Sequence, residues 1–231
     1  MHAIDEIGSV LVVSPHADDE VLGAGGLMAK LRKVDVPVRV LFMAVDGFHH
    51  YGLECDVTLQ ERMGEIKAVS SMLGFDFEIV YKGKDLLEKL DTVPKRELVD
   101  RFEREYNKTR PDLLILPHGE DYDQDHARTY ITAFAAARPI PQSLGKFFPK
   151  KIVTYEMPKL AWGEKPFQPN VYWDISTEIK TKLDAIGSYE SQLRDPPHIR
   201  ALENIKALAY LRGSEIGVEY AEAFHNLRWV G

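Results

Sequence analysis

Short apolar runs alternate with amphipathic stretches along this chain, and that alternation constrains the fold more than any other feature. The best amphipathic stretch, 58–74, begins with Thr58 and Glu61 in a capping-box arrangement, and Gly74 follows its last apolar residue. Strands that alternate with helices are typical of an α/β fold with a mostly parallel sheet and helices on both faces. We expect strands at 9–15, 36–46, 77–82, 112–117, 151–157 and 171–176, and helices at 20–33, 58–74, 94–108, 177–193 and 199–212, with another continuing through 129–137.

Length and charge limit the kinds of protein that this chain can be. Its 231 residues fit one large domain, 1–231. The formal net charge is −7, with 29 Lys and Arg against 36 Asp and Glu. Phosphate backbones and anionic lipids bind basic surfaces, so we expect neither nucleic acid nor a membrane as a partner. The sequence leaves open whether the chain forms a homo-oligomer.

The N-terminal segment and the single cysteine bear on location and on metal chemistry. Residues 1–9 are acidic and lack the basic and apolar regions of a signal peptide. No apolar run reaches the ~18 residues of a membrane span. We therefore expect a cytoplasmic protein. Cys55 is the only cysteine, which excludes an internal disulfide and a cysteine-rich metal site.

Histidines and carboxylates follow three of the expected strands. Ligands bind open α/β sheets beyond the carboxyl ends of the strands, so these residues should gather at one edge of the sheet. They are His16, Asp18, Asp19 and Glu20 after the first strand, Asp46 and His49 after the second, and His118, Asp121, Asp123, Asp125 and His126 after the fourth. Each cluster alone fits an ordinary helix start or loop, but their common place predicts a functional site there.

The stretch "HADDE" (16–20) has two interpretations. Acids at a helix N-terminus interact favourably with free N–H groups and the helix dipole, and one aspartate would suffice for that. Alternatively, His16 and Asp19 stand three residues apart on a turn, which lets both side chains reach one cation. Zinc accepts imidazole and carboxylate ligands, and a catalytic zinc uses three protein ligands and a water. Asp18 would then point elsewhere and serve as a base beside the metal.

The acidic stretch 121–129 offers a third ligand. Its spaced aspartates begin like a calcium loop, but His126 stands where that loop needs glycine and Thr132 where it needs a bidentate glutamate. We therefore exclude calcium. One interpretation is an acid-capped helix start with His126 as a chance neighbour. In the other, His126 completes a His/Asp/His set with His16 and Asp19.

Other common site patterns do not fit this sequence. The glycines of "GAGG" (23–26) come after the strand–helix turn, whose carboxylates would repel a pyrophosphate, so we interpret them as close packing of a helix on the sheet. The sequence contains neither a G-x-S-x-G nucleophile elbow nor a P-loop. Arg62, early in the helix 58–74, is either a solvated surface residue or a ligand for a substrate hydroxyl or phosphate.

These motifs together resemble a known family. "PHADDEVLGAGG" resembles the P-H-x-D-D-E motif of the LmbE-like (PIG-L) zinc-dependent N-deacetylases, "RMGEIKAVSSMLG" their R-x-x-E-x-x-x-A helix, and "DQDH" their H-x-D-H motif. "KLDAIGSYESQL" and "YAEAF" are similar to C-terminal parts of the family, so the resemblance extends over most of the chain. It implies a Rossmann-like fold, one zinc ion per subunit, and removal of the acetyl group from N-acetylglucosamine-type amino sugars. The expected partner is therefore a small-molecule amino sugar.

The resemblance also implies roles for individual residues. Carried over by position, the zinc ligands would be His16, Asp19 and His126. Asp18 would be the general base that activates the zinc-bound water. The substrate-binding candidates are Arg62, Asp46 and His49.

This chain departs from the family at Asp123, where the motif often has a histidine that stabilises an oxyanion. An ionised carboxylate would repel a developing oxyanion. We expect zinc alone or another donor to hold the oxyanion, and His118 is our candidate. Asp123 would instead orient a neighbouring histidine or bind a sugar hydroxyl. We expect Asp125 to fix a ligand imidazole, and Glu20 to be a first-turn acid that supports the ligands.

Two alternatives to this function stay open. The first is a metal-dependent amide hydrolase for a non-sugar N-acyl substrate, which a substrate panel with acetate detection separates from the sugar deacetylase. The second is a non-catalytic module that binds a ligand at the strand ends. The complete set of ligands and base argues against a binding module, whereas Asp123 argues for it.

Overall fold

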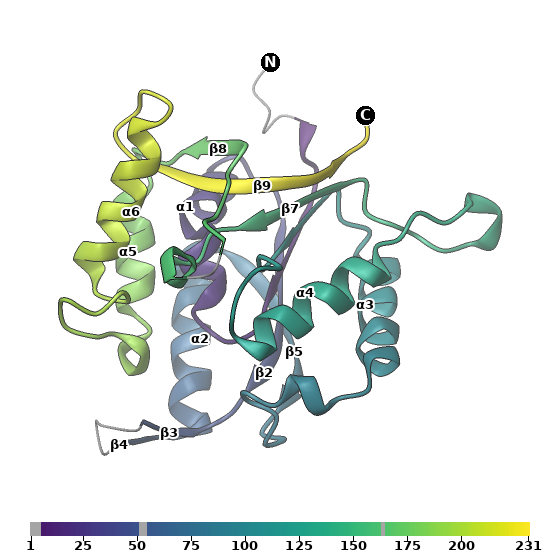
Figure 1. Cartoon of the computed structure of the whole chain (residues 1–231), viewed down its shortest axis with the longest axis horizontal. Coiled ribbons are helices and arrows are strands. Elements are labelled where there is room, and N and C mark those ends of the chain that lie inside the picture. The colour runs from purple at the N-terminus through teal and green to yellow at the C-terminus, as the bar shows by residue number, and fades with distance from the viewer. Residues whose placement is uncertain (1–5, 51–54, 163–164) are drawn as a thin grey trace.

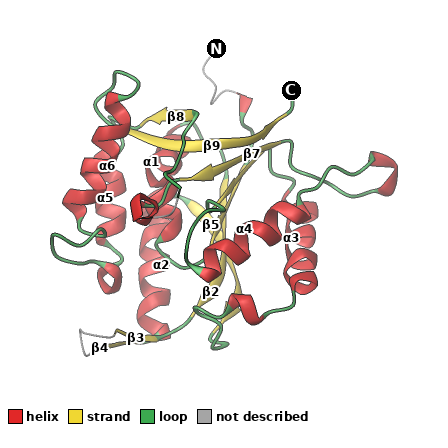
Figure 2. Ribbon diagram, viewed as in Figure 1, coloured by secondary structure: helices red, strands yellow, loops and turns green. Residues whose placement is uncertain are grey.

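The central feature of the computed structural model is a seven-stranded sheet in the order β5-β2-β1-β6-β7-β9-β8 (Figures 1 and 2). The structure describes residues 6–50, 55–162 and 165–231. Residues 1–5, which belong to the N-terminal segment that we expect not to be a signal peptide, lie outside these ranges. The strands are β1 (Val10–Ser14), β2 (Val38–Val45), β3 (Phe48–His50), β4 (Cys55–Val57), β5 (Phe75–Lys82), β6 (Leu113–Leu116), β7 (Lys151–Tyr155), β8 (Val171–Asp174) and β9 (Ala221–Trp229).

Strands β5, β2, β1, β6 and β7 are parallel to their neighbours, whereas β9 runs antiparallel between β7 and β8. The helices are α1 (Asp19–Lys33), α2 (Leu59–Leu73), α3 (Lys95–Thr109), α4 (Gln124–Ala136), α5 (Ile179–Gly187) and α6 (Leu202–Ser214). The α/β fold with a mostly parallel sheet is therefore confirmed. None of the helices in the described ranges is both long and apolar enough to cross a membrane.

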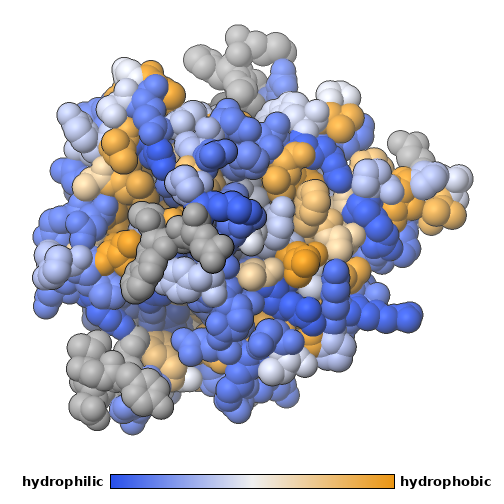
Figure 3. All heavy atoms as spheres, viewed as in Figure 1, coloured by the Kyte–Doolittle hydropathy of each residue, from blue (hydrophilic) through white to orange (hydrophobic). Residues whose placement is uncertain are grey.

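Helices cover both faces of the sheet because the central strands are apolar on both sides. In β1, Val10 and Val12 belong to the apolar cluster under α1, α2, α5 and α6. The alternate residues Leu11 and Val13 belong to the cluster under α3 and α4. All four side chains are at most 3% exposed, as expected for a strand that is buried on both faces. Figure 1 shows the two helical layers on opposite sides of the sheet, and the face seen in Figure 3 is mostly hydrophilic with scattered apolar groups.

The glycines near the start of α1 are packing positions, as predicted. A Cβ atom on Gly23 would lie 2.3 Å from the ring of Tyr155, and one on Gly26 would lie 2.7 Å from Ile175. The capping box of α2 is also confirmed, and Gly74 ends that helix in the left-handed conformation with φ of 71°. Local sequence signals and tertiary packing agree at these positions.

Two C-terminal helices differ from the expected ranges. The helix expected over 177–193 ends at Gly187, and a short 3-10 helix, Glu190–Gln192, follows it. The chain turns there because Tyr189 is fully buried and donates a hydrogen bond to Glu20. The helix expected over 199–212 begins at Leu202 and continues through Gly213 to Ser214. Gly213 does not stop this helix; a Cβ atom there would lie 2.7 Å from the backbone oxygens of residues 218 and 219.

Strand β9 and the antiparallel strand pair β3–β4 are not among the expected elements. Polar residues interrupt the apolar pattern of β9, and Glu222 is one of them. This side chain is nevertheless buried, because Lys182 lies 2.6 Å away and the backbone N–H groups of Gly26 and Leu27 each donate to it at 2.7 Å. Because a polar residue of this strand is paired inside the protein, the alternation of apolar and polar residues is too weak to predict the strand from the sequence.

Candidate metal centre

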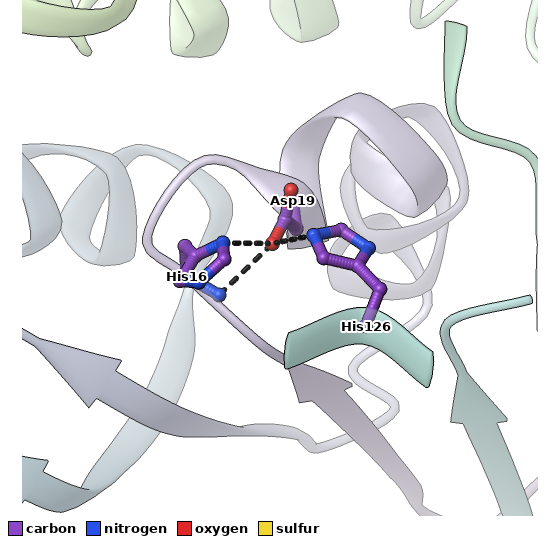
Figure 4. A group of neighbouring side chains, drawn as sticks. All are labelled: His16, Asp19 and His126. Atoms are coloured by element: carbon purple, nitrogen blue, oxygen red, sulfur yellow. Dashed lines mark hydrogen bonds and ion pairs between the residues drawn. The ribbon is translucent and has the colours of Figure 1, made fainter. Parts of the chain in front are cut away.

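Three side chains from two segments meet beyond the carboxyl ends of β1 and β6 (Figure 4). His16 lies in the turn after β1, Asp19 begins α1, and His126 lies in the first turn of α4. The turn places them through an unusual backbone at Asp18, whose φ is 123°. Such a conformation is costly for a residue with a side chain, and it is found mainly where surrounding structure or function requires it. The side chain of Asp18 makes no capping hydrogen bond to α1, so helix capping does not explain this residue.

The distances within this group fit a single metal ion. Asp19 Oδ2 lies 3.5 Å from His16 Nδ1 and 3.1 Å from His126 Nε2. All three ligand atoms lie within 4.8 Å of one another. A tetrahedral zinc site has bonds of about 2.0–2.2 Å, which places its ligand atoms about 3.3 Å apart. Small adjustments of the side chains would therefore bring all three atoms onto one ion.

Burial supports the same conclusion. Asp19 and His126 are each 1% exposed. Asp19 Oδ1 is buried, and among the described residues it has no hydrogen-bond partner. A buried carboxylate without a full set of partners is costly unless a cation compensates it. The donor set and this free oxygen both fit a divalent metal ion.

Two further carboxylates hold the imidazoles. Asp125 Oδ2 lies 3.0 Å from Nε2 of His16, the nitrogen that points away from Asp19. Asp121 Oδ2 lies 3.0 Å from Nδ1 of His126, which is an ion-pair contact whose atoms are not aligned as a hydrogen bond. Carboxylates in these places fix the tautomer and the orientation of metal-binding imidazoles. Asp125 contacts His16, and its role in fixing that imidazole stays a prediction. Asp121 was expected only as a member of the group after the fourth strand, and its contact with His126 was not predicted.

The carboxylates and imidazoles of this group shift one another's pKa values. Burial raises the pKa of Asp19, but the facing His126 outweighs burial, and the pKa of this carboxyl falls below its usual value. Burial lowers the pKa of His126, but Asp19 and Asp121 outweigh it and raise the pKa to about 10. Without a metal, a proton on His126 thus supplies positive charge to the site. A metal ion would take the place of that proton.

Asp18 and Glu20 are also buried beside the group. Asp18 is 3% exposed, and burial raises the pKa of its carboxyl, although Arg200 at 3.7 Å opposes this shift. A carboxylate with a raised pKa can both accept and return a proton. Glu20 accepts hydrogen bonds from Asp18 N, at 3.1 Å, and from Tyr189 Oη, and its burial raises its pKa to about 7. Glu20 therefore ties the strained turn to the C-terminal half of the chain.

Asp123 has a double role at the start of α4. Its Oδ1 accepts hydrogen bonds from the backbone N–H groups of Asp125 and His126, at 2.9 and 3.4 Å, as an N-cap. Its Oδ2 accepts a hydrogen bond of 3.0 Å from Lys159 Nζ and lies 4.0 Å from His126 Nε2. Lys159 follows a different strand, β7, and no motif in the sequence connected it to this site.

His118 lies among Thr154, Phe167 and His225. Its Nδ1 is 3.0 Å from Thr154 Oγ1, and its ring meets Phe167 edge-on at a centroid distance of 4.9 Å. Burial and the neighbouring His225 lower the pKa of His118, which favours the neutral imidazole. A neutral ring can donate only one hydrogen bond, and it brings no positive charge to an oxyanion. The oxyanion role of His118 stays a prediction.

The three substrate-binding candidates have protein partners of their own. Arg62 is 4% exposed, which corrects the alternative of a solvated surface residue, and its guanidinium donates to Glu65, Ser191 and the carbonyl oxygen of Ala17. It therefore links α2 to the turn after β1. Asp46 accepts hydrogen bonds from the backbone N–H groups of Gly47 and Asp85. His49 Nδ1 lies 2.8 Å from Asp56 Oδ1. Substrate binding by these residues stays a prediction.

Three solved structures share this fold over nearly the whole chain. The conserved protein TT1542 from Thermus thermophilus is 25% identical, with 96% of each chain covered and a TM-score of 0.74. The 4-carboxy-2-hydroxymuconate hydratase GalB from Pseudomonas putida KT2440 is 20% identical, with 96% of this chain and 97% of that chain covered and a TM-score of 0.76. The N,N'-diacetylchitobiose deacetylase from Pyrococcus horikoshii, complexed with its inhibitor MPG, is 23% identical, with 97% of this chain and 85% of that chain covered and a TM-score of 0.72. A fold shared by a hydratase and a deacetylase does not by itself choose the chemistry.

The family comparison is more specific. The model of the PIG-L family, described as GlcNAc-PI de-N-acetylase, matches residues 11–137. This region runs from β1 through α4 and contains His16, Asp19 and His126. It is more than half of the 231 residues. The family predicted from the "PHADDE" motif is therefore confirmed, and this chain belongs to the PIG-L (GlcNAc-PI de-N-acetylase) family.

Proposed function

We propose that this protein is a zinc-dependent hydrolase that removes the acetyl group from an N-acetylglucosamine-type amino sugar. The products are acetate and the free amine. The observation that carries this proposal is the group of His16 Nδ1, Asp19 Oδ2 and His126 Nε2, whose spacing fits one metal ion, with buried Asp18 beside it. Membership of the PIG-L family supports the same reaction.

The chain's own residues supply the proton transfers. A zinc ion held by His16, Asp19 and His126 would supply Lewis acidity and lower the pKa of a water toward ~7. Asp18 accepts the proton of the attacking water and returns it to the amine nitrogen as the C–N bond breaks. The raised pKa of Asp18 favours this return, because a more basic carboxylate holds the proton until the amine needs it.

The residues around this core position it. Asp121 and Asp125 hold the two imidazoles. Arg62 keeps α2 against the turn after β1 through its hydrogen bond to the carbonyl oxygen of Ala17. Asp46 and His49, which follow β2, are the residues that we propose contact the sugar.

The test is acetate release by zinc-loaded protein. The panel contains free N-acetylglucosamine, a nucleotide-linked form, a form with a small aglycone, and non-sugar N-acyl amides. We expect acetate from at least one sugar. Acetate from non-sugar amides alone would move the protein to another class of amide hydrolase, and no turnover in a zinc-replete preparation would favour a binding module.

Variants separate metal binding from catalysis. Asp18→Asn should abolish acetate release while zinc stays bound, and turnover at the wild-type rate would overturn the assignment of the base. His16→Ala, Asp19→Ala and His126→Ala should each lose zinc, as measured by metal analysis of the purified protein. Asp85→Asn is the matched control, because this aspartate is 89% exposed in its side chain and pairs with Lys89.

A further inference from the structure

The amide chemistry proposed above requires a partner for the oxygen that becomes negative when water adds to the carbonyl carbon. Carboxylates dominate the site, since Asp19, Asp121, Asp123 and Asp125 each lie within 4.0 Å of an imidazole nitrogen of His16 or His126. The position where the family often has histidine is occupied by Asp123. An anionic side chain there would oppose the developing charge unless a cation lies against it.

Lys159 provides that cation. Its Nζ donates to Asp123 Oδ2 at 3.0 Å and lies 3.4 Å from Asp121 Oδ1. Its Nζ also lies 5.5 Å from the ring centroid of Tyr122. The side chain of Lys159 is only 11% exposed, so water screens its charge weakly.

The backbone holds Lys159 in place. This residue belongs to a short 3-10 helix, Pro158–Trp162, which directly follows β7 and the buried Met157. Leu160 is 2% exposed and donates its N–H to the carbonyl oxygen of Met157. The ammonium group is therefore presented by a well-packed segment, and little reorganisation is needed when charge develops.

We propose that Lys159, held by Asp123, stabilises the oxyanion in the proposed deacetylation and so takes over the role of the family's histidine. Two successive contacts, of 3.0 and 4.0 Å, connect its Nζ through Asp123 Oδ2 to His126 Nε2, the nitrogen that faces Asp19. Lys159 reaches the site from the β7 side, whereas Asp18 lies in the turn after β1, two strands away in the sheet. Asp18 and Lys159 thus approach the His16, Asp19 and His126 group from different elements.

The chemistry of the ammonium group fits this role. It has three N–H donors. One is hydrogen-bonded to Asp123, and Asp121 lies 3.4 Å away as an ion-pair partner, so in our proposal a remaining donor serves the carbonyl oxygen of a substrate. Burial lowers the pKa of Lys159, but Asp19, Asp123 and Asp121 outweigh it and raise the pKa, so the group stays protonated. Asp123 holds the donor through its Oδ2. This accounts for a carboxylate at a position where one alone would be unfavourable.

The experiment compares Lys159→Met with the wild type in the zinc-loaded protein. We expect kcat to fall by about 100–1000-fold, as for loss of one oxyanion donor, with KM nearly unchanged. A readout without turnover is the Kd of an N-methylphosphonyl glucosamine, a tetrahedral anion that imitates the intermediate. Its binding should weaken greatly in Lys159→Met, whereas zinc content and zinc Kd should stay within threefold of the wild type.

Several results would overturn the role of Lys159 while the proposed function stands. The first is a kcat of Lys159→Met within threefold of the wild type, and the second is a change in its KM alone. The third is loss of zinc from Lys159→Met, which would assign Lys159 a structural role. No acetate release by the wild type itself would overturn the proposed function instead.

Further variants keep the test decisive if Lys159→Met does not fold. Lys159→Arg keeps the charge and should retain at least a tenth of the kcat. Asp123→Asn keeps an N-cap for α4 but removes the charge that holds Nζ, so kcat should fall about 10-fold. Wild-type kcat in Asp123→Asn would refute the positioning by Asp123. The control is Lys165→Met, whose lysine pairs with Glu120 on the surface and is 68% exposed in its side chain; its kinetics should not change.

Discussion

Asp121→Asn should weaken zinc binding although Asp121 is not among the proposed ligands. Its Oδ2 lies 3.0 Å from His126 Nδ1, and Asp121 is 5% exposed. A proton kept on Nδ1 by this carboxylate would leave the lone pair of Nε2 for a metal ion bound beside Asp19. Asparagine has nearly the same shape but no charge, and its amide can also turn its NH₂ group toward the imidazole. The imidazole would then lose its orientation and part of its basicity.

The size of the effect can be estimated in two ways. Loss of an outer carboxylate typically costs 10–100-fold in metal affinity, or about 1.4–2.7 kcal/mol. A hydrogen bond to a charged group contributes about 1.5–3 kcal/mol. The two ranges overlap, so the zinc Kd of Asp121→Asn should rise about 10–100-fold. Asp121 also accepts a 3.0 Å hydrogen bond from Asp123 N, which the remaining amide oxygen can keep.

The assay is competition with a chromogenic chelator on protein first stripped of metal, at one pH. Thermal unfolding of the stripped protein checks that the fold is intact. Asp85→Asn, an exposed aspartate elsewhere on the surface, should bind zinc like the wild type. If Asp121→Asn folds normally and its zinc Kd lies within twofold of the wild type, Asp121 does not orient His126 and the reasoning is wrong.

Two stability measurements test other parts of the structure. In metal-free protein, burial raises the pKa of Glu20 to about 7 from 4.5, so Glu20 contributes stability that is complete below pH 4.5 and is lost as pH rises through 7. The wild type should therefore lose stability relative to Glu20→Gln between pH 4 and pH 8, by of order 3 kcal/mol in the free energy of unfolding measured by urea titration. A difference that does not change with pH would contradict the pKa. Gly23→Ala should cost about 1–3 kcal/mol, because its Cβ would lie 2.3 Å from the ring of Tyr155, whereas Gly64→Ala, with nothing within 4 Å, should be neutral or stabilising. Equal unfolding midpoints for these two alanine variants would refute the packing argument.

The fold was predictable where local signals and burial agree. The run 9–15 is apolar at every central position because β1 is covered on both faces, and such a run is recognisable in the sequence. The helix α2 was predictable because its capping box and Gly74 depend only on neighbouring residues. Strand β9 was not, because Glu222 finds its partner Lys182 40 residues away. Tertiary pairing of that kind leaves no periodic pattern.

Some residues of the candidate site were likewise predictable from the sequence, and others were not. His16, Asp19 and His126 could be proposed together because each follows a strand, and parallel strands bring their carboxyl ends to one edge. Lys159 also follows a strand, but it stands alone in "MPKLAW" without a second polar residue to single it out. Strand order decides its place: β7 lies next to β6, so the segment after β7 passes beside the start of α4.

Asp123 shows why a departure from a motif has to be judged together with its surroundings. Considered alone, a carboxylate in place of an oxyanion-stabilising histidine is evidence against catalysis. In our proposal the carboxylate instead holds the ammonium group of Lys159, whose Nζ lies 3.0 Å away. An aspartate at this position also favours the helix, because aspartate is a better N-cap than histidine. Its Oδ1 caps α4, the helix that carries His126. One residue can thus secure the helix of a proposed ligand and anchor a charge beside it, and both roles would be invisible in a comparison of motifs alone.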